Sequence, residues 1–186
     1  MNRGAVRGVE MLKNTARVMW EAPQTAVTPQ AKQFPSISVI GLGYVGAVSA
    51  ACFSKIGHRV VGVDLDTRKT DAINAGKGPL VEHDLDDYIA DGIQEGRISA
   101  INSSLGAIVA TDMTFVCVGT PSEADGSVNL NALMGAARDI GMAIKAKRSW
   151  HLVVIRSTIP AGTTRATLLP EIERVSGLKA GDDFGL

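Results

Sequence analysis

The sequence predicts an α/β protein with a Rossmann-like, doubly wound parallel sheet, and three observations lead to this prediction. From Ile37 onward, short β-branched segments without charges alternate with longer segments of helical composition, as expected for a parallel sheet covered by helices on both faces. The first short segment runs directly into the glycine pattern G-x-G-x-x-G. The second ends at Asp64, about 20 residues after the glycines, which is the spacing of a dinucleotide-binding βαβ unit.

The first βαβ unit carries the clearest pattern. Residues Ile37–Ile40 form an apolar run that predicts a strand buried on both faces. Small and apolar residues predict a helix over Tyr44–Ile56, and Gly57 follows as its C-terminal stop. A second buried strand is predicted over Arg59–Val63.

The alternation continues through the rest of the chain. Asp66 is the candidate N-cap of a helix over Thr67–Ala75, and Gly76 closes that helix. The pattern then predicts helices over Leu85–Gln94, Leu105–Val109, Leu130–Lys147 and Thr163–Val175, and strands over Arg97–Ala100, Met113–Val118 and Leu152–Arg156. We expect Pro170 either to bend the last helix or to limit its usable length, because proline has no backbone N–H.

The length of 186 residues allows one domain of ordinary size plus a tail. We place the domain over residues 36–186 and a disordered arm over residues 1–35, where basic residues outnumber acidic ones. A transit peptide and a start codon assigned too far upstream are the alternatives for the arm. The formal net charge of zero argues against capture of nucleic acid or of an anionic membrane surface. No apolar run is long enough to cross a bilayer.

Each glycine of the pattern has its own steric reason. Gly41 permits a tight turn, Gly43 lets the backbone approach a pyrophosphate, and Gly46 allows close packing of the helix on the strand. The helix N-terminus then faces the phosphates. Asp64 is placed to accept hydrogen bonds from the adenosine ribose, which favours NAD over NADP.

Two cations after Asp64 complicate the choice of cofactor. Arg68 and Lys69 follow the strand closely enough to hold a 2′-phosphate. The carboxylate of Asp64 would repel that phosphate, so we predict NAD. The alternative is a purely structural glycine turn, with Asp64 capping the next helix, but Asp66 is the better cap.

The cysteines and histidines do not form a reactive or metal-binding group. Cys52 falls in the first helix and Cys117 in a predicted strand, so we interpret both as packing residues rather than nucleophiles. Two cysteines without metal-ligand spacing favour a reducing, cytoplasmic compartment. The three histidines are scattered along the chain at His58, His83 and His151, and we predict no metal site.

Hydroxyl-rich loops follow two of the later strands. In an open parallel sheet, ligands collect beyond the carboxyl ends of the strands. Residues 119–122, with the sequence GTPS, follow one strand, and residues 157–162, with the sequence STIPAG, follow another. Both loops are candidates for the nicotinamide side of the site, although ordinary strand-to-helix loops use the same residue types.

Three stretches in this order carry a resemblance to a known family: ISVIGLGYVG, FVCVGTPSEADGSVNL and VVIRSTIPAGTT. Together they resemble the NAD domain of the nucleotide-sugar 6-dehydrogenases, which oxidise the C6 alcohol of the sugar to a carboxylate. The resemblance covers Ser36 to Leu186. RST at residues 156–158, RDIG at 138–141 and SGLKAGDDFG at 176–185 are more similar to members that act on GDP-mannose than to members that act on UDP-glucose.

The resemblance implies roles for individual residues. Tyr44 and Val45 would contact the cofactor phosphates at the glycine turn, and Lys69 would join Asp64 at the adenosine ribose. Thr120 would line the cofactor site. Thr158 would bind the cofactor beside the reacting centre and act as an auxiliary catalytic residue that helps to orient the catalytic water.

A loop near the two ligands departs from the family pattern. The resemblance places Glu82 as a possible substrate contact, in PLVEHDL, where the family has P-x-V-E-P-G-L. Here His83 and Asp84 replace proline and glycine, which weakens the inference for Glu82. The alternative is a surface acid that precedes a helix.

The family reaction also needs a cysteine thiolate, a lysine and an asparagine, which the family places beyond the stretch that resembles this chain. We therefore expect a fragment that binds NAD but does not complete the oxidation alone. The full-length enzyme is expected to be a homo-oligomer that acts on GDP-mannose. The alternatives are a fragment of a UDP-glucose 6-dehydrogenase and a non-catalytic NAD-binding module; a related hydroxy-acid dehydrogenase fits the three stretches less well.

Overall fold

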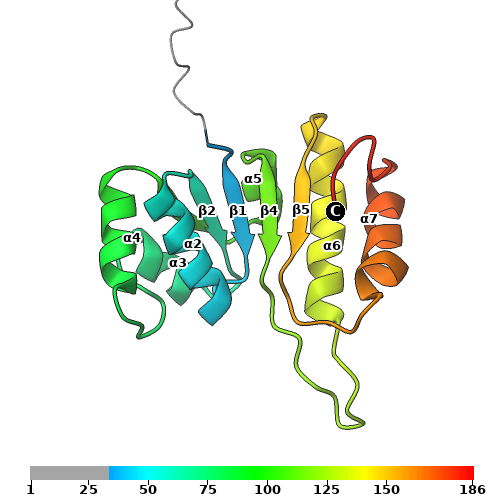
Figure 1. The fold of residues 1–186 in the computed structure, drawn as a ribbon, viewed down its shortest axis with the longest axis horizontal. Coiled ribbons are helices and arrows are strands. Elements are labelled where there is room, and N and C mark those ends of the chain that lie inside the picture. Colours follow the sequence, from blue (N-terminus) through cyan, green and yellow to red (C-terminus); the bar gives the residue numbers. More distant parts are fainter. Residues whose placement is uncertain (1–33) are drawn as a thin grey trace, which may run out of the picture. The chain divides into compact units, whose positions relative to one another are not determined.

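The computed structural model describes residues 34–186, which form a five-stranded parallel sheet (Figure 1). The strand order is β3-β2-β1-β4-β5. The strands are β1 Ile37–Ile40, β2 Val60–Val63, β3 Ile98–Ile101, β4 Met113–Val116 and β5 Leu152–Ile155. The order reverses between β1 and β4, as in doubly wound folds, where the two chain directions diverge from the central strand. The predicted fold class is confirmed.

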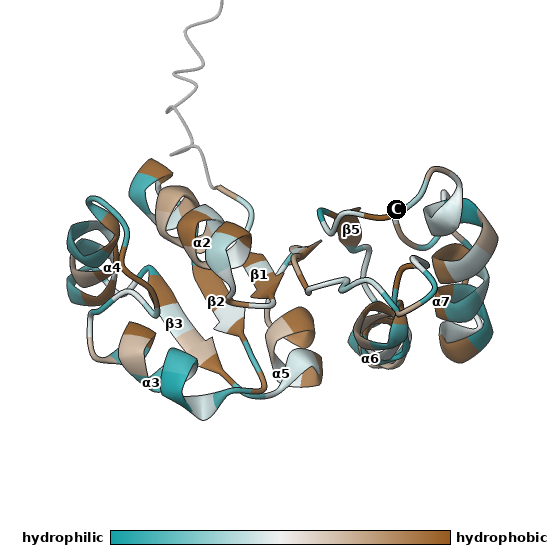
Figure 2. Cartoon of the chain, turned by 90° about the horizontal axis from the view of Figure 1, so that it is seen from below, coloured by the Kyte–Doolittle hydropathy of each residue, from teal (hydrophilic) through white to brown (hydrophobic). Residues whose placement is uncertain are grey.

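Helices cover the two faces of the sheet (Figure 2). In that view α2 and α4 lie on one face, and α5 and α6 lie on the other. The helices are α2 Tyr44–Ile56, α3 Thr67–Asn74, α4 Leu85–Gln94, α5 Ser104–Val109, α6 Asn131–Lys147 and α7 Leu169–Ser176, with the π-helix η1 Thr164–Leu168 before α7. Among the described residues, none of these helices has the length and apolarity needed to cross a membrane.

Each face of the sheet has its own hydrophobic core. Neighbouring residues along β1 point to opposite faces, so Val39 packs in the cluster with Ile89 of α4, whereas Ile40 packs in the cluster with Ile140 of α6. All four residues of β1 are buried. This explains why the central strand reads as a continuous apolar run rather than as an alternating one.

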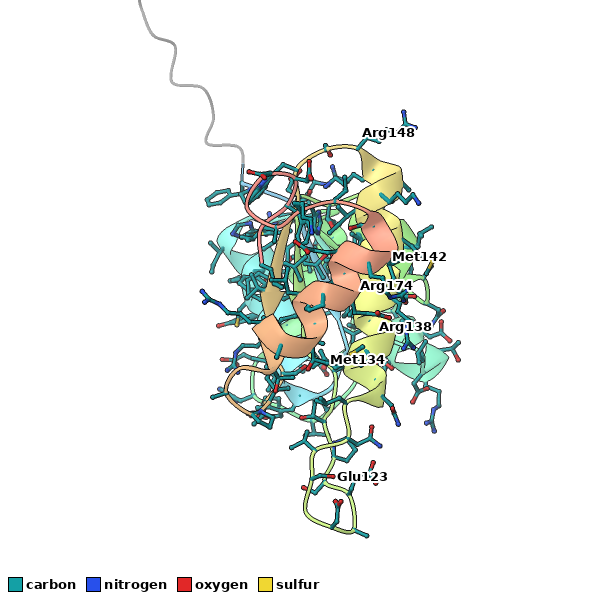
Figure 3. All side chains as sticks on the ribbon, turned by 90° about the vertical axis from the view of Figure 1, so that its right-hand side faces the viewer. Glu123, Met134, Arg138, Met142, Arg148 and Arg174 are labelled. Atoms are coloured by element: carbon teal, nitrogen blue, oxygen red, sulfur yellow. The ribbon has the colours of Figure 1, made fainter. Side chains whose placement is uncertain are left out.

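The last predicted helix is continuous, but its hydrogen bonding changes from π-helical to α-helical just before Pro170. A π-helical turn over Thr164–Leu168 precedes α7, and Pro170 lies in the first turn of α7. Proline is tolerated there because the first N–H groups of an α-helix have no intrahelical partner. Helix α7 packs against α6, and Figure 3 labels Arg138 of α6 and Arg174 of α7 in this region. Glu171 accepts hydrogen bonds from Arg138 at 2.7 Å and from Arg174 at 2.7 and 2.9 Å.

A row of hydrogen-bonded polar side chains lies near the amino ends of the central strands. His151 is fully buried, and its Nε2 lies 2.8 Å from the Thr114 hydroxyl, which lies 2.6 Å from that of Ser38. The Nδ1 of His151 lies 3.0 Å from Nζ of Lys147. An ammonium group only donates, so Nδ1 accepts from Lys147 and Nε2 carries the proton donated to Thr114.

The prediction that both cysteines are packing residues is wrong for Cys52. This residue lies in α2 as expected, but its side chain is exposed. Helix α2 packs on the sheet through the small residues Ala47, Ala50 and Ala51. Cys52 lies outside this buried face and points to solvent. The N-terminal arm lies largely outside the described residues, so its expected disorder stays a prediction.

Candidate cofactor site

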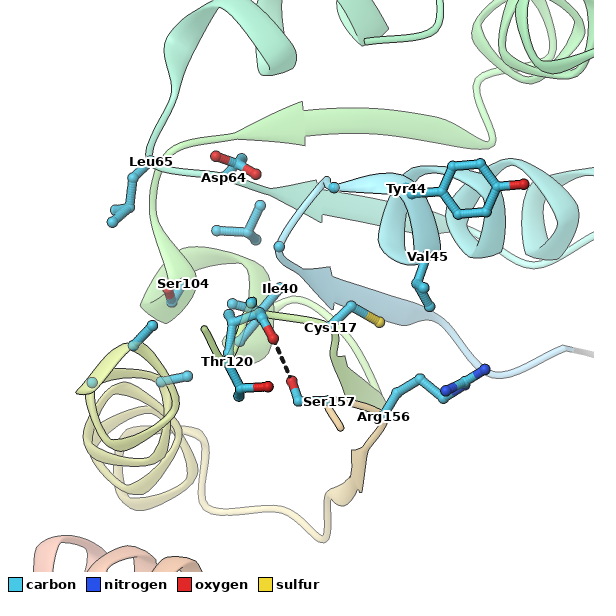
Figure 4. Close-up of a pocket in the computed structure, with 18 of the residues that line it drawn as sticks. Ile40, Tyr44, Val45, Asp64, Leu65, Ser104, Cys117, Thr120, Arg156 and Ser157 are labelled. Atoms are coloured by element: carbon cyan, nitrogen blue, oxygen red, sulfur yellow. Dashed lines mark hydrogen bonds between the residues drawn. The ribbon is translucent and has the colours of Figure 1, made fainter. Parts of the chain in front are cut away.

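A pocket of about 840 Å³ opens at the carboxyl ends of β1, β2, β4 and β5 (Figure 4). This volume is in the range of small-molecule sites. Of the predicted site residues, the following line it: Gly41, Gly43, Tyr44, Val45, Asp64, Lys69, Thr120 and Thr158. Gly46 and Glu82 do not line the pocket. The elements thus converge where doubly wound sheets bind nucleotides, at the point where the strand order reverses.

The three glycines of the turn have three different surroundings. Gly41 has a φ of 94°, and a Cβ there would lie 2.8 Å from the carbonyl oxygen of Cys117. A Cβ at Gly46 would lie 1.7 Å from the carbonyl oxygen of Gly41, so this glycine is needed for close packing of α2. A Cβ at Gly43 would meet nothing within 4 Å. No protein atom occupies the space beside Gly43. That space is therefore open to a ligand, as expected if the Gly43 backbone approaches a phosphate.

Asp64 is held in place with hydrogen-bonding capacity to spare. Its Oδ2 accepts from the backbone N–H of Leu42 at 2.8 Å and from Nζ of Lys69 at 2.9 Å, and its Oδ1 accepts from the N–H of Asp66 at 2.9 Å. A carboxylate has about four acceptor sites, so capacity remains for a ribose hydroxyl. Burial opposes ionisation, but the hydrogen bonds from Asp66, Lys69 and Leu42 outweigh it and lower the pKa of Asp64.

The two cations after β2 are both paired with acids. Arg68 binds the carboxylate of Asp66 through Nε at 2.9 Å and through Nη2 at 2.8 Å. Asp66 also accepts from the backbone N–H of Arg68 at 3.1 Å, which confirms it as the N-cap of α3. Lys69 binds Asp64 as described above. The site therefore presents Asp64, rather than a free pair of cations, at the end of β2.

Glu82 lies beside Tyr44 rather than in the pocket lining. Its negative charge and a side-chain hydrogen bond raise the pKa of the Tyr44 phenol, so the two side chains are close. The next two residues, His83 and Asp84, are the ones that depart from the family loop. Asp84 has a φ of 59°, in the left-handed region where glycine is favoured. The backbone has therefore kept a conformation suited to the glycine that the resemblance leads one to expect there.

The loops after β4 and β5 form the opposite wall of the pocket. The Thr120 hydroxyl donates to the carbonyl oxygen of Thr158 at 2.7 Å, and the Ser157 hydroxyl donates to that of Val118 at 2.7 Å. Cys117 lies just past β4 and lines the pocket, so its interpretation as a packing residue of a strand was incomplete. Burial raises the pKa of its thiol, which keeps it protonated near neutral pH.

Sequence reasoning missed the contribution of helix α6. Asn131, Ala132, Gly135 and Ala136 line the pocket, together with Ser104 at the start of α5. Their spacing puts the α6 residues on one face of the helix. The small side chains at these positions were the available signal, but small residues also occur at ordinary helix packing surfaces. Among the described residues, no group of three or more histidine, cysteine or acidic side chains is arranged to hold a metal ion.

Residues 35–186 match the model of the UDP-glucose/GDP-mannose dehydrogenase family, NAD binding domain. The chain belongs to this family. Its cofactor is accordingly NAD, and the open space at Gly43 and the spare capacity of Asp64 fit that cofactor.

The chain is similar to the GDP-mannose 6-dehydrogenase of Pseudomonas aeruginosa, with 47% identity over 150 residues, 81% of this chain and 34% of that protein. A UDP-glucose 6-dehydrogenase from Haloferax volcanii is 39% identical over 150 residues, again 81% of this chain and 34% of that protein. The chain thus spans about a third of the length of the curated relatives that it matches.

Solved structures show the same likeness. A ternary complex of GDP-mannose dehydrogenase from Pseudomonas aeruginosa matches with a TM-score of 0.79 and 47% identity, over 80% of this chain and 34% of that one. A UDP-glucose dehydrogenase from Pyrobaculum islandicum matches with a TM-score of 0.77 and 40% identity, over 85% of this chain and 36% of that one.

Proposed function

We propose that this chain is the NAD-binding part of a GDP-mannose 6-dehydrogenase. The overall reaction oxidises the C6 alcohol of GDP-mannose to the carboxylate of GDP-mannuronate, while two NAD are reduced to NADH and water supplies the second carboxylate oxygen. The observation that carries the proposal is the pocket at the strand ends, in which Gly43 leaves open space and Asp64 retains acceptor capacity. The higher identity to the GDP-mannose enzyme than to the UDP-glucose enzyme supports the choice of sugar nucleotide.

Within this proposal, residues 36–186 are the cofactor domain. Tyr44 and Val45 contact the phosphates, Asp64 and Lys69 hold the adenosine ribose, and Thr120 and Thr158 line the nicotinamide side. Thr158 also helps to orient the water. Glu82 approaches the substrate from beside Tyr44, outside the cofactor pocket. The full-length enzyme is a homo-oligomer of the cytoplasm.

We infer that the 186-residue chain does not complete the oxidation alone. The family reaction uses a thiolate to hold the C6 aldehyde covalently before the second oxidation. Cys117 is a poor candidate because burial raises the pKa of its thiol. Cys52 is exposed on α2 and does not line the pocket. Binding of NAD without turnover of the sugar nucleotide is therefore the expected behaviour.

Two assays test this proposal. The purified chain, incubated with NAD and GDP-mannose, should form no NADH, while calorimetry shows binding of NAD. In a second assay, residues 35–186 replace the matching region of the Pseudomonas aeruginosa GDP-mannose enzyme or of the Haloferax volcanii UDP-glucose enzyme. The first chimera should form NADH with its sugar nucleotide faster than the second does with UDP-glucose. The reverse order would favour the UDP-glucose alternative, and two inactive chimeras would favour a non-catalytic module.

A further inference from the structure

Two hydroxyl groups join the loop after β4 to the loop after β5 in a reciprocal way. Thr120 of the first loop donates to the backbone carbonyl of Thr158 in the second, at 2.7 Å. Ser157 of the second loop donates to the backbone carbonyl of Val118 in the first, at 2.7 Å. In Figure 4 the Ser157 and Thr120 side chains lie together at the wall of the pocket, and the dashed line ends at the Ser157 hydroxyl, which donates to Val118. We call this pair of hydrogen bonds the loop clasp.

The clasp begins where the sheet ends. The backbone N–H groups of Arg156 and Ser157 both donate to the carbonyl oxygen of Val116, at 2.9 and 3.0 Å. In the described part of the chain, the hydrogen bonds between residues 118–120 and 157–158 are the two side-chain bonds of the clasp. Strand pairing therefore joins the two loops as far as Val116, and the two hydroxyls join them to each other in the part that faces the pocket.

The clasped segment is a wall of the cofactor site. Val118, Gly119, Thr120, Ser157 and Thr158 all line the pocket. A Cβ at Gly119 would meet nothing within 4 Å, so the pocket is open beside this residue, while the neighbouring Val118 packs against the core beneath the sheet. Asp64 lies at the other end of the pocket, beyond β1, at the end of β2. Because a dinucleotide spans the crevice from one mononucleotide half to the other, the clasped wall faces the nicotinamide half.

We propose that Ser157 and Thr120 are positioning residues whose clasp holds the nicotinamide-side wall in its binding geometry. The Thr120 proton is committed to the Thr158 carbonyl, so the Thr120 oxygen faces the site as an acceptor only. Ser157 contributes through Val118, which it holds against the second loop. This inference rests on the proposed cofactor site and adds the residues that shape one half of it.

The test compares two ligands that share the adenosine half. NAD and ADP-ribose are titrated by calorimetry into the full chain and into Ser157→Ala, Thr120→Val and Ser157→Thr variants. The loss of one hydrogen bond is expected to weaken NAD binding about 5- to 10-fold. Binding of ADP-ribose, which lacks nicotinamide, should change by less than about twofold because Asp64 and the glycine turn are intact. Ser157→Thr retains the hydroxyl and should restore most of the NAD affinity.

The matched control is Thr163→Val. The Thr163 hydroxyl donates to the carbonyl oxygen of Pro160 at 2.8 Å, within its own loop, so its loss should leave both affinities unchanged. Equal weakening of NAD and ADP-ribose in the Ser157→Ala and Thr120→Val variants, or no weakening of either, would overturn the clasp. Failure of both variants to fold would also overturn it, because the bonds would then determine the fold rather than the site. A wild-type chain that binds ADP-ribose but not NAD would contradict the clasp alone, whereas binding of neither would refute the cofactor site itself.

Discussion

The two ends of the same sheet use similar polar side chains for opposite purposes. At the carboxyl end, Asp64 and Thr120 each make hydrogen bonds to the protein and retain acceptor capacity toward an open pocket. Near the amino end, the side chains of Lys147, His151, Thr114 and Ser38 form a linear series of hydrogen bonds within the protein. The difference shows that spare hydrogen-bonding capacity, rather than polarity, distinguishes the ligand site from the structural one.

The largest effects should come from the glycine turn, where stability and binding can be separated. Gly46→Ala places a Cβ 1.7 Å from the Gly41 carbonyl oxygen, so α2 must shift and both the melting temperature and NAD binding should fall sharply. Gly43→Ala adds a Cβ to open space, so the chain should fold normally and lose NAD binding about 100-fold or more, because the methyl group occupies the phosphate position. Thermal unfolding and calorimetry on both variants check this. Equal loss of stability in both would contradict the assignment of roles.

Replacing Asp64 should produce the next largest effect on binding. Asp64→Ala removes charged acceptors for the ribose, and we expect NAD affinity to fall about 10- to 100-fold. Asp66→Ala is the matched control, because Asp66 caps α3 and does not line the pocket. Loss of the cap should cost about 1 kcal/mol of stability and leave NAD affinity almost unchanged. Calorimetry and urea unfolding measure both variants. A loss of NAD affinity in Asp66→Ala, or none in Asp64→Ala, would contradict the assignment of Asp64 to the ribose.

At the amino end, the expected effect is on stability and depends on pH. Burial, together with the charge of Lys147, lowers the pKa of His151 from 6.5 to about 4. Between these values the unfolded chain binds a proton that the folded chain does not, so the contribution of His151 is fully present above about pH 6.5 and is lost as the pH falls toward 4. The total is about 3 kcal/mol.

Urea unfolding of the wild type and of His151→Gln at several pH values measures this contribution. The difference in unfolding free energy between the two proteins should shrink by that amount between pH 6.5 and 4. NAD affinity at neutral pH should be the same in both proteins. A difference that does not change with pH would show that the imidazole is not held neutral in the fold.

The smallest predicted effect concerns the loop near Tyr44. Asp84 has a φ of 59°, and glycine adopts this conformation without a steric penalty. Relief of this strain in Asp84→Gly should raise the free energy of unfolding by about 0.5–1 kcal/mol. The greater conformational freedom of glycine in the unfolded chain offsets part of this gain. Leu85→Gly, at a buried helical position, is the contrasting change and should destabilise strongly. A destabilised Asp84→Gly variant would contradict the claim that strain at this backbone position outweighs the contact with His83 and the added freedom of the unfolded chain.

Local patterns predicted the fold well because local constraints determine its elements. The strand at Ile37–Ile40 is apolar on both faces, and Asp66 caps the helix that follows β2. The separate roles of Gly41 and Gly46 are visible in sequence because each glycine satisfies a local steric need. The position of Asp64 beside the glycine turn was predictable for a similar reason, since the end of β2 must lie next to that turn.

The remaining features depend on contacts between distant segments. The exposure of Cys52 depends on which side of α2 faces the sheet, and that helix has small or apolar residues around most of its surface. His151 is isolated in the sequence, and Ser38 and Thr114 come close to it only because the sheet places β1 and β4 side by side. The loop clasp and the α6 wall likewise arise from the packing of separate strands and helices, which residue type at a single position does not specify.

The most direct test of the central claim is calorimetric titration of the purified chain with NAD and with NADP, repeated with Asp64→Ala. We expect one NAD per chain, weaker binding of NADP, and a clear loss of NAD affinity in the variant. A folded chain that binds no NAD, or an Asp64→Ala variant that binds NAD as tightly as the wild type, would contradict the claim that the carboxyl-end pocket is the cofactor site.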